Sequence, residues 1–336
     1  MSIYQIWQNL KTPKRKKDNS KTQRYLLIKR WGGGFWSDVD HLYVQIAAAE
    51  AMGRTPIVQW GRQGTYGNGI FETFELYFEP VSKTTIRDMA GEIWPPVWTH
   101  KNLMDDLPFG QSFDMFVPYK TFGSAKTGLR EIWTLQDMMS RKEEILVSYH
   151  HEHASELLKI VPEESRFHGL SEQQLRRLIM SESICLNEKI RKKIDQFWTQ
   201  SSLSENALAV HVRGSDKILE NPDLHYHNKI ILERAKLWNG QIFLLTESER
   251  YAHLWKNEFG DQVLMQNCSR TANEEISSHD DPFVDGYQKG CEILIDTYTA
   301  AKCKSFIGTY SSNVGKFVAA IRDMNLNAPK FVDLGP

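Results

Sequence analysis

The sequence predicts an α/β protein built from two doubly wound domains that face each other across a cleft. Three observations support this fold class. Short apolar runs alternate with helix-length segments through the second half, and the first half opens with the same succession of strand, glycine turn and helix. The length of 336 residues gives room for two domains of roughly 150 residues each. Apolar residues make up 41% of the chain, which suits packed cores rather than disorder.

The near-continuous apolar runs of the second half are typical of parallel strands that are buried on both faces. They predict strands over 207–212, 242–245, 263–265 and 306–307. Helix-length segments separate these runs and predict helices over 227–238, 248–259, 286–301 and 313–324. We therefore expect residues 201–336 to form a C-terminal domain.

The first half begins with a predicted strand over 25–28, a turn at glycines 32–34, a helix over 37–52 and a strand over 55–58. One face of that helix is apolar, and Gly53 is well placed to end it. Residues 131–200 are predicted to be mostly helical, with a capping box at 171–174. We expect residues 1–200 to form an N-terminal domain with this helical insertion.

Charge and composition exclude several function classes. The net charge of −1 and the lack of a basic stripe argue against a nucleic-acid module. The basic run 11–17 is predicted to be a mobile surface segment, with a weak contact to anionic lipid or an acidic partner as the alternative. No stretch reaches the roughly 18 apolar residues of a membrane span, and the start lacks a signal core. Four scattered cysteines are expected to be reduced, which indicates a cytoplasmic protein.

Polar residues lie at or directly after the ends of three of the predicted strands. These residues are His211, Arg213, Asp216 and Lys217 after the first, Thr246 and Glu247 after the second, and 308–313 after the fourth. The carboxyl ends of parallel strands meet at one edge of a sheet, where α/β proteins bind ligands. The planar guanidinium of Arg213 can make paired hydrogen bonds to a diphosphate. The sequence therefore predicts a phosphate site at this edge.

Two further segments have both a binding and a structural interpretation. Ser311, Ser312 and Asn313 open a predicted helix, where hydroxyls and N–H groups bind anions, but serine and asparagine are also preferred N-caps. With Arg213 on a neighbouring strand, phosphate binding is favoured there. The glycine run 32–34 lets backbone approach a phosphate, and it equally forms a tight turn.

Segment 211–217 resembles the His-x-Arg-x-x-Asp motif of the α1,2-, α1,6- and protein O-fucosyltransferase superfamily. Further similarities keep the same order along the chain: His225, the strand end 243–247, the pair Ile295-Asp296, and 307–314. The glycine loop with 53–55 resembles the first loop and second strand of that family. The similarity is greatest to the α1,6 branch, which includes bacterial nodulation-factor and animal core fucosyltransferases. It covers 205–322 well and 24–60 in part.

The resemblance implies a GT-B-like fold, with two Rossmann-like domains and the donor nucleotide held mainly by the C-terminal one. It implies inverting, metal-independent transfer of fucose from GDP-fucose to a glycan acceptor, without a cofactor. The donor site would comprise Gly33, Gly34, Phe35, His211, Arg213, Thr246, Glu247, Asp296, Ser311, Ser312 and Asn313. The catalytic candidates are Arg213, Lys217, Asp216 and Glu220.

By the same resemblance, His211 and Asp296 would contact guanine. The chemistry of Asp296 agrees, because apolar neighbours surround it in a predicted helix and a buried carboxylate needs a donor partner. The N1–H and N2–H groups of guanine supply two donors. A lysine or arginine of the protein is the structural alternative.

The sequence departs from the family at two positions. Many members carry a second arginine where this chain has Gly214, which removes one phosphate contact. The acidic residue taken as the general base falls on Asn221, with Glu220 one residue earlier; Asp216 and Asp285 are alternatives. A general base contributes typically about 10²–10⁴-fold, so a displaced base would slow the reaction without abolishing it.

Other motifs are given structural interpretations. Asp38-Val39-Asp40 spells Asp-x-Asp, a metal-binding pattern in another glycosyltransferase fold, but a helix start capped by Ser37 explains it better. Residues 150–153 lack a zinc-protease spacing and are expected on a solvated helix face. The aromatic residues of the segment 60–122 either stack on sugars or fill an irregular loop: Trp60, Tyr66, Trp94, Trp98 and Tyr119.

Several alternatives concern function. A GT-B transferase with another nucleotide-sugar donor, or a nucleotide-sugar-binding protein without catalysis, would carry the same fold. The expected partners are the nucleotide-sugar donor and a glycan or lipid-linked glycan acceptor. The expected setting is bacterial surface polysaccharide synthesis, with the run 11–17 near the inner membrane face.

Overall fold

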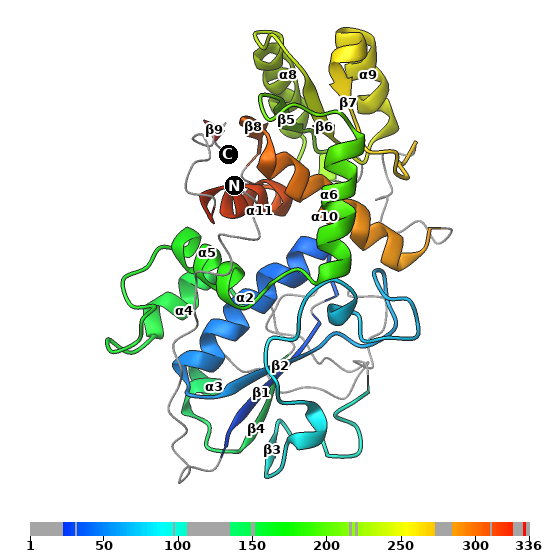
Figure 1. Cartoon of the computed structure of the whole chain (residues 1–336). Coiled ribbons are helices and arrows are strands. Elements are labelled where there is room, and N and C mark those ends of the chain that lie inside the picture. The colour runs from blue at the N-terminus through cyan, green and yellow to red at the C-terminus, as the bar shows by residue number, and fades with distance from the viewer. Residues whose placement is uncertain are drawn as a thin grey trace.

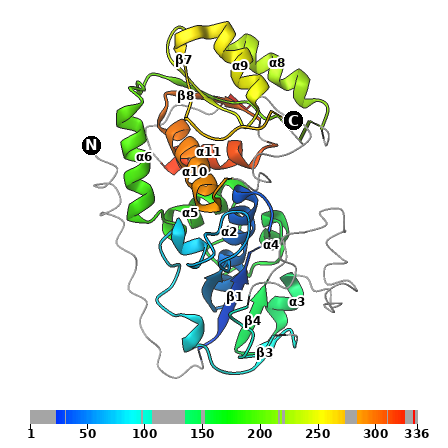
Figure 2. The same ribbon diagram turned by 90° about the vertical axis from the view of Figure 1, so that its right-hand side faces the viewer.

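The computed structural model describes residues 23–30, 32–96, 98–105, 135–148, 152–214, 217–218, 221–272, 284–309, 311–324 and 332–333. Within these ranges the strands form two parallel sheets, in the orders β2-β1-β4-β3 and β7-β6-β5-β8-β9. The first sheet lies at one end of the molecule and the second at the other, with helices between them (Figures 1 and 2). The predicted α/β fold class is confirmed.

The first sheet is built around β1 (Tyr25–Lys29), which is buried along its whole length. It pairs with β2 (Thr55–Gln59) on one side and β4 (Ile145–Ser148) on the other, and β3 (Ile93–Trp94) lies beyond β4. Helix α2 (Phe35–Ala51) packs on this sheet and follows the glycine turn. The predicted strand, turn and helix are therefore confirmed, although α2 begins two residues earlier than expected.

The segment predicted to be mostly helical contains α3 (Leu135–Ser140), α4 (Ala154–Ile160), α5 (Glu172–Glu182) and α6 (Glu188–Gln200). The expected capping box is present, because Ser171 Oγ accepts from Gln174 N and Ser171 N donates to the Gln174 side chain. Strand β4 interrupts the helices, so the prediction was wrong for Ile145–Ser148.

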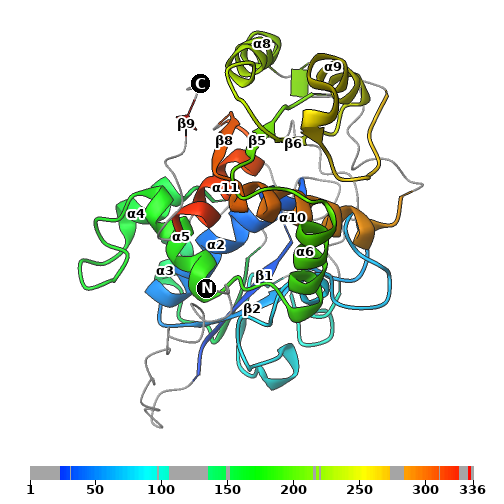
Figure 3. The same ribbon diagram turned by 45° about the horizontal axis from the view of Figure 1, so that its top comes forward.

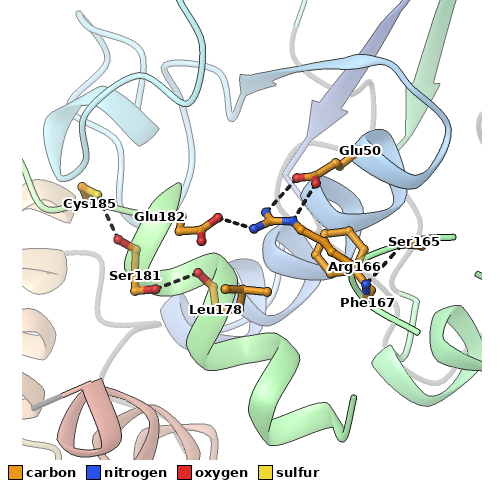
Figure 4. Close-up of polar contacts among 8 residues, drawn as sticks. All are labelled: Glu50, Ser165, Arg166, Phe167, Leu178, Ser181, Glu182 and Cys185. Atoms are coloured by element: carbon orange, nitrogen blue, oxygen red, sulfur yellow. Dashed lines mark hydrogen bonds and ion pairs between the residues drawn. The ribbon is translucent and has the colours of Figure 1, made fainter. Parts of the chain in front are cut away.

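Arg166 connects the helical insertion to α2. Its guanidinium donates to Glu50 at 2.6 and 2.8 Å and to Glu182, on α5, at 2.7 Å. Figure 4 shows the side chain between the two carboxylates. All three side chains are partly exposed, so the pairs fix the relative position of the helices more than they add stability.

The second sheet contains β5 (Leu208–His211), β6 (Ile242–Leu245), β7 (Val263–Leu264), β8 (Ser305–Gly308) and the unpredicted β9 (Val332–Asp333). The other predicted strands are confirmed within two residues. The predicted helices are confirmed with bounds that differ by at most three residues: α8 (Leu224–Ala235), α9 (Glu249–Phe259), α10 (Gly286–Lys302) and α11 (Asn313–Met324). The chain leaves β7, passes through α10 and returns on the far side of β5, so the winding direction changes between β5 and β8.

Both faces of this second sheet are covered, as the apolar runs predicted. Alternate residues of β5 point to opposite faces: Leu208 and Val210 join one apolar cluster with residues of α8 and α9, whereas Ala209 joins another with residues of α10 and α11. Figure 3 shows α8 and α9 on one side of the strands and α10 and α11 on the other. The cluster that contains Ala209 continues into the strands of the first sheet, so the two halves of the protein share one core.

The aromatic residues of the 60–122 segment belong to this core rather than to an open surface. Trp60, Tyr66, Trp94 and Trp98 are each at most 5% exposed, and Tyr119 lies outside the described residues. The ring of Phe35 packs against two of them, with ring centroids 6.3 Å from Trp60 and 5.2 Å from Tyr66. Burial favours core packing for Trp60, Trp94 and Trp98, whereas Tyr66 is buried but also lines the cavity of the candidate site.

Two global expectations can be compared with the described residues. No helix among them is long and apolar enough to cross a membrane. The four cysteines are free thiols, and Cys291 and Cys303 are buried. The basic run 11–17 lies outside the described residues.

Candidate active site

A cavity of about 670 Å³ lies between the two halves, at the carboxyl ends of β5, β6 and β8. Every predicted site residue that the structure describes lines it: Gly33, Gly34, Phe35, His211, Arg213, Lys217, Thr246, Glu247, Asp296, Ser311, Ser312 and Asn313. Asp216 and Glu220 lie outside the described residues. The position agrees with the change of winding direction between β5 and β8, where sheets of this type bind ligands.

The end of β5 supplies His211, which is only 5% exposed. Burial, with a smaller contribution from the charge of Arg213, lowers the pKa of His211 to about 3. The imidazole is therefore neutral at physiological pH. Its Nδ1 atom is buried and has no hydrogen-bond partner among the described residues. A buried nitrogen without a hydrogen-bond partner destabilises the folded protein unless a ligand or a water molecule pairs with it.

Asp296, on α10, lines the same cavity. Burial raises the pKa of Asp296 to about 7; Glu292 acts in the same direction and Arg270 in the opposite one. With its amide turned so that the nitrogen faces Asp296, Gln266 donates to Asp296 Oδ1 at 2.8 Å. The carboxylate is thus held by a neutral amide, and no lysine or arginine forms an ion pair with it within 4 Å in the described part of the chain.

Arg213 follows β5 and lies against Glu247, which follows the neighbouring strand β6. The distance from Arg213 Nη1 to Glu247 Oε1 is 2.5 Å, and the side chains are 19% and 13% exposed. Asn228 Nδ2 donates to the carbonyl of Arg213 at 2.7 Å, which holds the backbone at this point. A charged guanidinium is therefore fixed in the cavity wall.

Gly214, where the family often has arginine, is closely packed. A Cβ atom there would lie 2.8 Å from Ser248 Cβ and 3.1 Å from the ring of Tyr251. Tyr251 OH in turn lies 3.3 Å from Nδ1 of His225. The glycine thus permits the loop after β5 to lie close to the start of α9. His225, one of the residues that resemble the family, contacts Tyr251 and so supports this loop.

The start of α11 forms the third side of the cavity. Thr309 Oγ1 is buried without a hydrogen-bond partner among the described residues, directly before the segment that opens the helix. Gly315 lets the first turn of α11 lie close to the backbone of Thr309, because a Cβ atom there would be 2.4 Å from the Thr309 carbonyl oxygen. A helix N-terminus, an unpaired buried hydroxyl and Arg213 together form an environment suited to an anion.

The glycine loop and Phe35 line the facing wall, but three of their N–H groups are already bonded. Asp38 Oδ1 accepts from Gly32 N at 2.7 Å and Gly33 N at 3.1 Å, and Phe35 N donates to Tyr66 OH. The Gly33 and Phe35 amides therefore shape a turn, as the structural interpretation predicted. Phosphate contact by Gly34 stays a prediction.

The Asp-x-Asp pair does not form a joint metal site. Asp38 is fully buried and faces the glycine loop, whereas Asp40 binds Arg176 at 3.1 Å. Ser37 does not cap α2; its hydroxyl accepts from Asn313 Nδ2 at 2.9 Å across the cleft. In the described part of the chain, no three His, Cys, Asp or Glu side chains are placed to share a metal ion.

Other predicted positions have structural roles. Asp285 is the N-cap of α10 and accepts from Gln288 N, and it does not line the cavity. Asn221 lines the cavity, and its Oδ1 accepts from Asp223 N. Glu152 and His153 precede α4 rather than forming a helix face, and burial raises the pKa of Glu152 to about 7. Residues 150 and 151 lie outside the described residues.

Several cavity residues were missed by the sequence interpretation. They include Thr65, Tyr66, Lys289, Glu292 and Thr297. Thr309, which also lines the cavity, belongs to the segment 308–313 that was predicted at this edge. The missed residues lie on a glycine-rich loop or on turns of α10, and which way those turns face depends on the fold.

No protein-family model and no curated protein matches the sequence. Solved structures do match. Fucosyltransferase NodZ from Bradyrhizobium has a TM-score of 0.55 and 18% identity, over 93% of this chain and 95% of that one. NodZ α-1,6-fucosyltransferase co-crystallised with GDP has a TM-score of 0.53 and 20% identity, with the same coverage.

This chain has the GT-B fold of NodZ. The match spans nearly the whole of both chains, so the expected pair of Rossmann-like domains facing a cleft is confirmed. POFUT1 in complex with GDP is also similar, with a TM-score of 0.49 and 14% identity over 92% of this chain and 98% of that one. At these identities the likeness concerns the fold.

Proposed function

We propose that this protein is a glycosyltransferase that transfers fucose from GDP-fucose to a glycan acceptor. The observation that carries the proposal is the cavity at the carboxyl ends of β5, β6 and β8. The predicted residues that the structure describes line it, and two of these lining residues, His211 and Thr309, each carry a buried polar atom without a partner among the described residues. The fold shared with NodZ, whose crystals were soaked with GDP-fucose, supports the same proposal.

The base would bind between His211 and Asp296. An ionised Asp296 accepts from adjacent donors, and guanine presents N1–H beside N2–H, whereas adenine and uracil do not present that pair. The neutral imidazole of His211 can donate or accept through its unpaired nitrogen. A site that leaves a buried carboxylate unpaired with the wrong base discriminates strongly.

The diphosphate would bind at Arg213 and the first turn of α11. Guanidinium N–H groups, the helix dipole and the Thr309 hydroxyl are all suited to a phosphate oxygen. In a direct displacement, the acceptor hydroxyl gives its proton to a base, its oxygen attacks the anomeric carbon, the bond to the diphosphate breaks so that GDP leaves, and the configuration at the anomeric carbon inverts. Arg213 then stabilises the charge that develops on the leaving group, so the reaction needs no metal or cofactor. The base assignment to Glu220 or Asp216 stays a prediction.

Thermal unfolding with different nucleotides tests the proposal. At equal concentration, GDP should raise the unfolding midpoint well above the values with UDP or ADP, because only guanine presents the paired donors. GDP-fucose without acceptor should be hydrolysed slowly, and GDP-mannose and UDP-sugars more slowly still. Equal stabilisation by UDP would exclude the guanine site. Stabilisation by GDP without any turnover would instead indicate a binding protein.

A further inference from the structure

The ion pair between Arg213 and Glu247 is an unusual feature of a phosphate site. The two groups follow the adjacent strands β5 and β6, whose register places His211 opposite Leu245. The carboxylate and guanidinium are in direct contact at 2.5 Å, and both line the cavity. A carboxylate beside a diphosphate repels it, so Glu247 by its charge alone weakens the binding that Arg213 provides.

Geometry explains why such a carboxylate is present. A guanidinium is planar, and its N–H groups have fixed directions, so holding one terminal nitrogen fixes the direction of the others. The backbone is held at both residues: Asn228 donates to the Arg213 carbonyl, and Thr271 N donates to the Glu247 carbonyl at 2.8 Å. Glu247 thus orients a flexible arginine from a rigid support.

The orientation of Arg213 matters more here because Gly214 leaves no room for a second arginine at the next position. We propose that Glu247 is a positioning residue, which holds Arg213 in the plane that receives the donor diphosphate and acts on binding and transfer only through Arg213. The proposal rests on the proposed function.

The two effects of Glu247 predict opposite results for Glu247→Ala. If orientation dominates, removing the carboxylate weakens GDP and inorganic pyrophosphate binding about tenfold, the usual size for one lost charge-assisted hydrogen bond. If repulsion dominates, both ligands bind more tightly. Glu247→Gln retains an acceptor without charge, so it should restore affinity to within about threefold of wild type and recover most of kcat. Glu249→Ala, at an exposed position two residues on, is the matched control.

A double-mutant cycle decides whether Glu247 acts through Arg213. Calorimetric titration with GDP is measured for wild type, Glu247→Ala, Arg213→Ala and the double variant, with the ligand-free unfolding midpoint as a check on folding. We expect Glu247→Ala to have no further effect once Arg213 is absent. An equal loss in that background, tighter binding by Glu247→Ala, or failure of Gln to rescue would each overturn the proposal. If Arg213→Ala binds GDP like wild type, the phosphate clamp of the proposed function fails, and the role of Glu247 fails with it.

Discussion

The indole of Trp36 lies nearly flat on the ring of Phe317, with ring centroids 4.3 Å apart and an interplanar angle of 19°. Trp36 is in the first turn of α2 and Phe317 is in α11, so the contact joins the two halves beside the cavity. Trp36 Nε1 also donates to Thr297 Oγ1 at 2.9 Å. These contacts fix the start of α2, directly after the glycine loop, relative to α10 and α11.

Replacing Trp36 by Ala should destabilise the protein by about 3–5 kcal/mol, because a 3%-exposed indole is lost from the core. The same change should reduce stabilisation by GDP, since the two cavity walls lose their fixed spacing. Trp36→Phe keeps a stacked ring but loses the hydrogen bond, so its free energy of unfolding should be lower than that of wild type by about 1–2 kcal/mol. Denaturant unfolding measures both values, and an unchanged midpoint for the alanine variant would show that the contact is unimportant.

Arg213→Ala should reduce transfer activity by about a hundredfold or more, because the charge that develops on the leaving diphosphate loses its main stabilising group. Arg213→Lys should restore activity only in part, since an ammonium cannot make the paired contact. Both variants should fold, because the side chain is part of the cavity wall rather than the core. Initial rates with GDP-fucose measure the effect, and activity within about threefold of wild type would contradict the assignment.

Transfer activity should survive excess EDTA, since we assign the diphosphate to Arg213 and the first turn of α11. Asp38 and Asp40 are bonded to the glycine loop and to Arg176, on different sides of α2. The measurement compares rates with EDTA alone and after added Mn²⁺ or Mg²⁺. Complete loss that either ion reverses would show that a metal takes part.

The second sheet could be predicted well because its strands are buried on both faces. Runs such as Ile242–Leu245 are apolar at every position, and the polar residues that follow mark the edge at which ligands bind. That rule located the cavity residues that follow β5, β6 and β8, whereas Asp296 on α10 came from the family resemblance. Strand β4 was missed because Ile145–Ser148 is short and adjoins helical segments, and its pairing with β1 joins positions 120 residues apart, as Tyr25 and Ile145 show.

Side-chain direction was the part that the sequence could not supply. Ser37 was expected to cap α2, but the helix starts at Phe35 and the Asp38 carboxylate turns back to the glycine amides. In the same way, Trp60 is enclosed by rings from distant segments, which no local pattern reveals. The first feature is a local turn whose side-chain direction the pattern does not show, and the second depends on packing between separate segments.

Asp296 gives a prediction about stability. Burial raises the pKa of Asp296 from its ordinary value of 3.8 to about 7, so between these values the folded state holds the proton more tightly than the unfolded state. The stability that this carboxyl contributes is therefore present at low pH and is lost as the pH rises toward 7. Asp296→Asn should unfold at a higher temperature than wild type at pH 8, and the difference should shrink by pH 5. A constant difference would contradict the raised pKa.

The same carboxyl should make GDP binding depend on pH. Guanine donors need an ionised Asp296, and below pH 7 the free protein increasingly carries the proton, so GDP affinity should fall by up to about tenfold per pH unit. His211, with a pKa of about 3, stays neutral and adds nothing in this range. Asp296→Asn should bind GDP weakly and without this dependence. Glu292→Gln should keep the pH dependence of GDP binding but move its midpoint to lower pH, because Glu292 raises the pKa of Asp296. Calorimetric titrations between pH 5.5 and 8 on about half-unit steps test this, and a GDP affinity that is constant across the range in wild type would remove Asp296 from the guanine site.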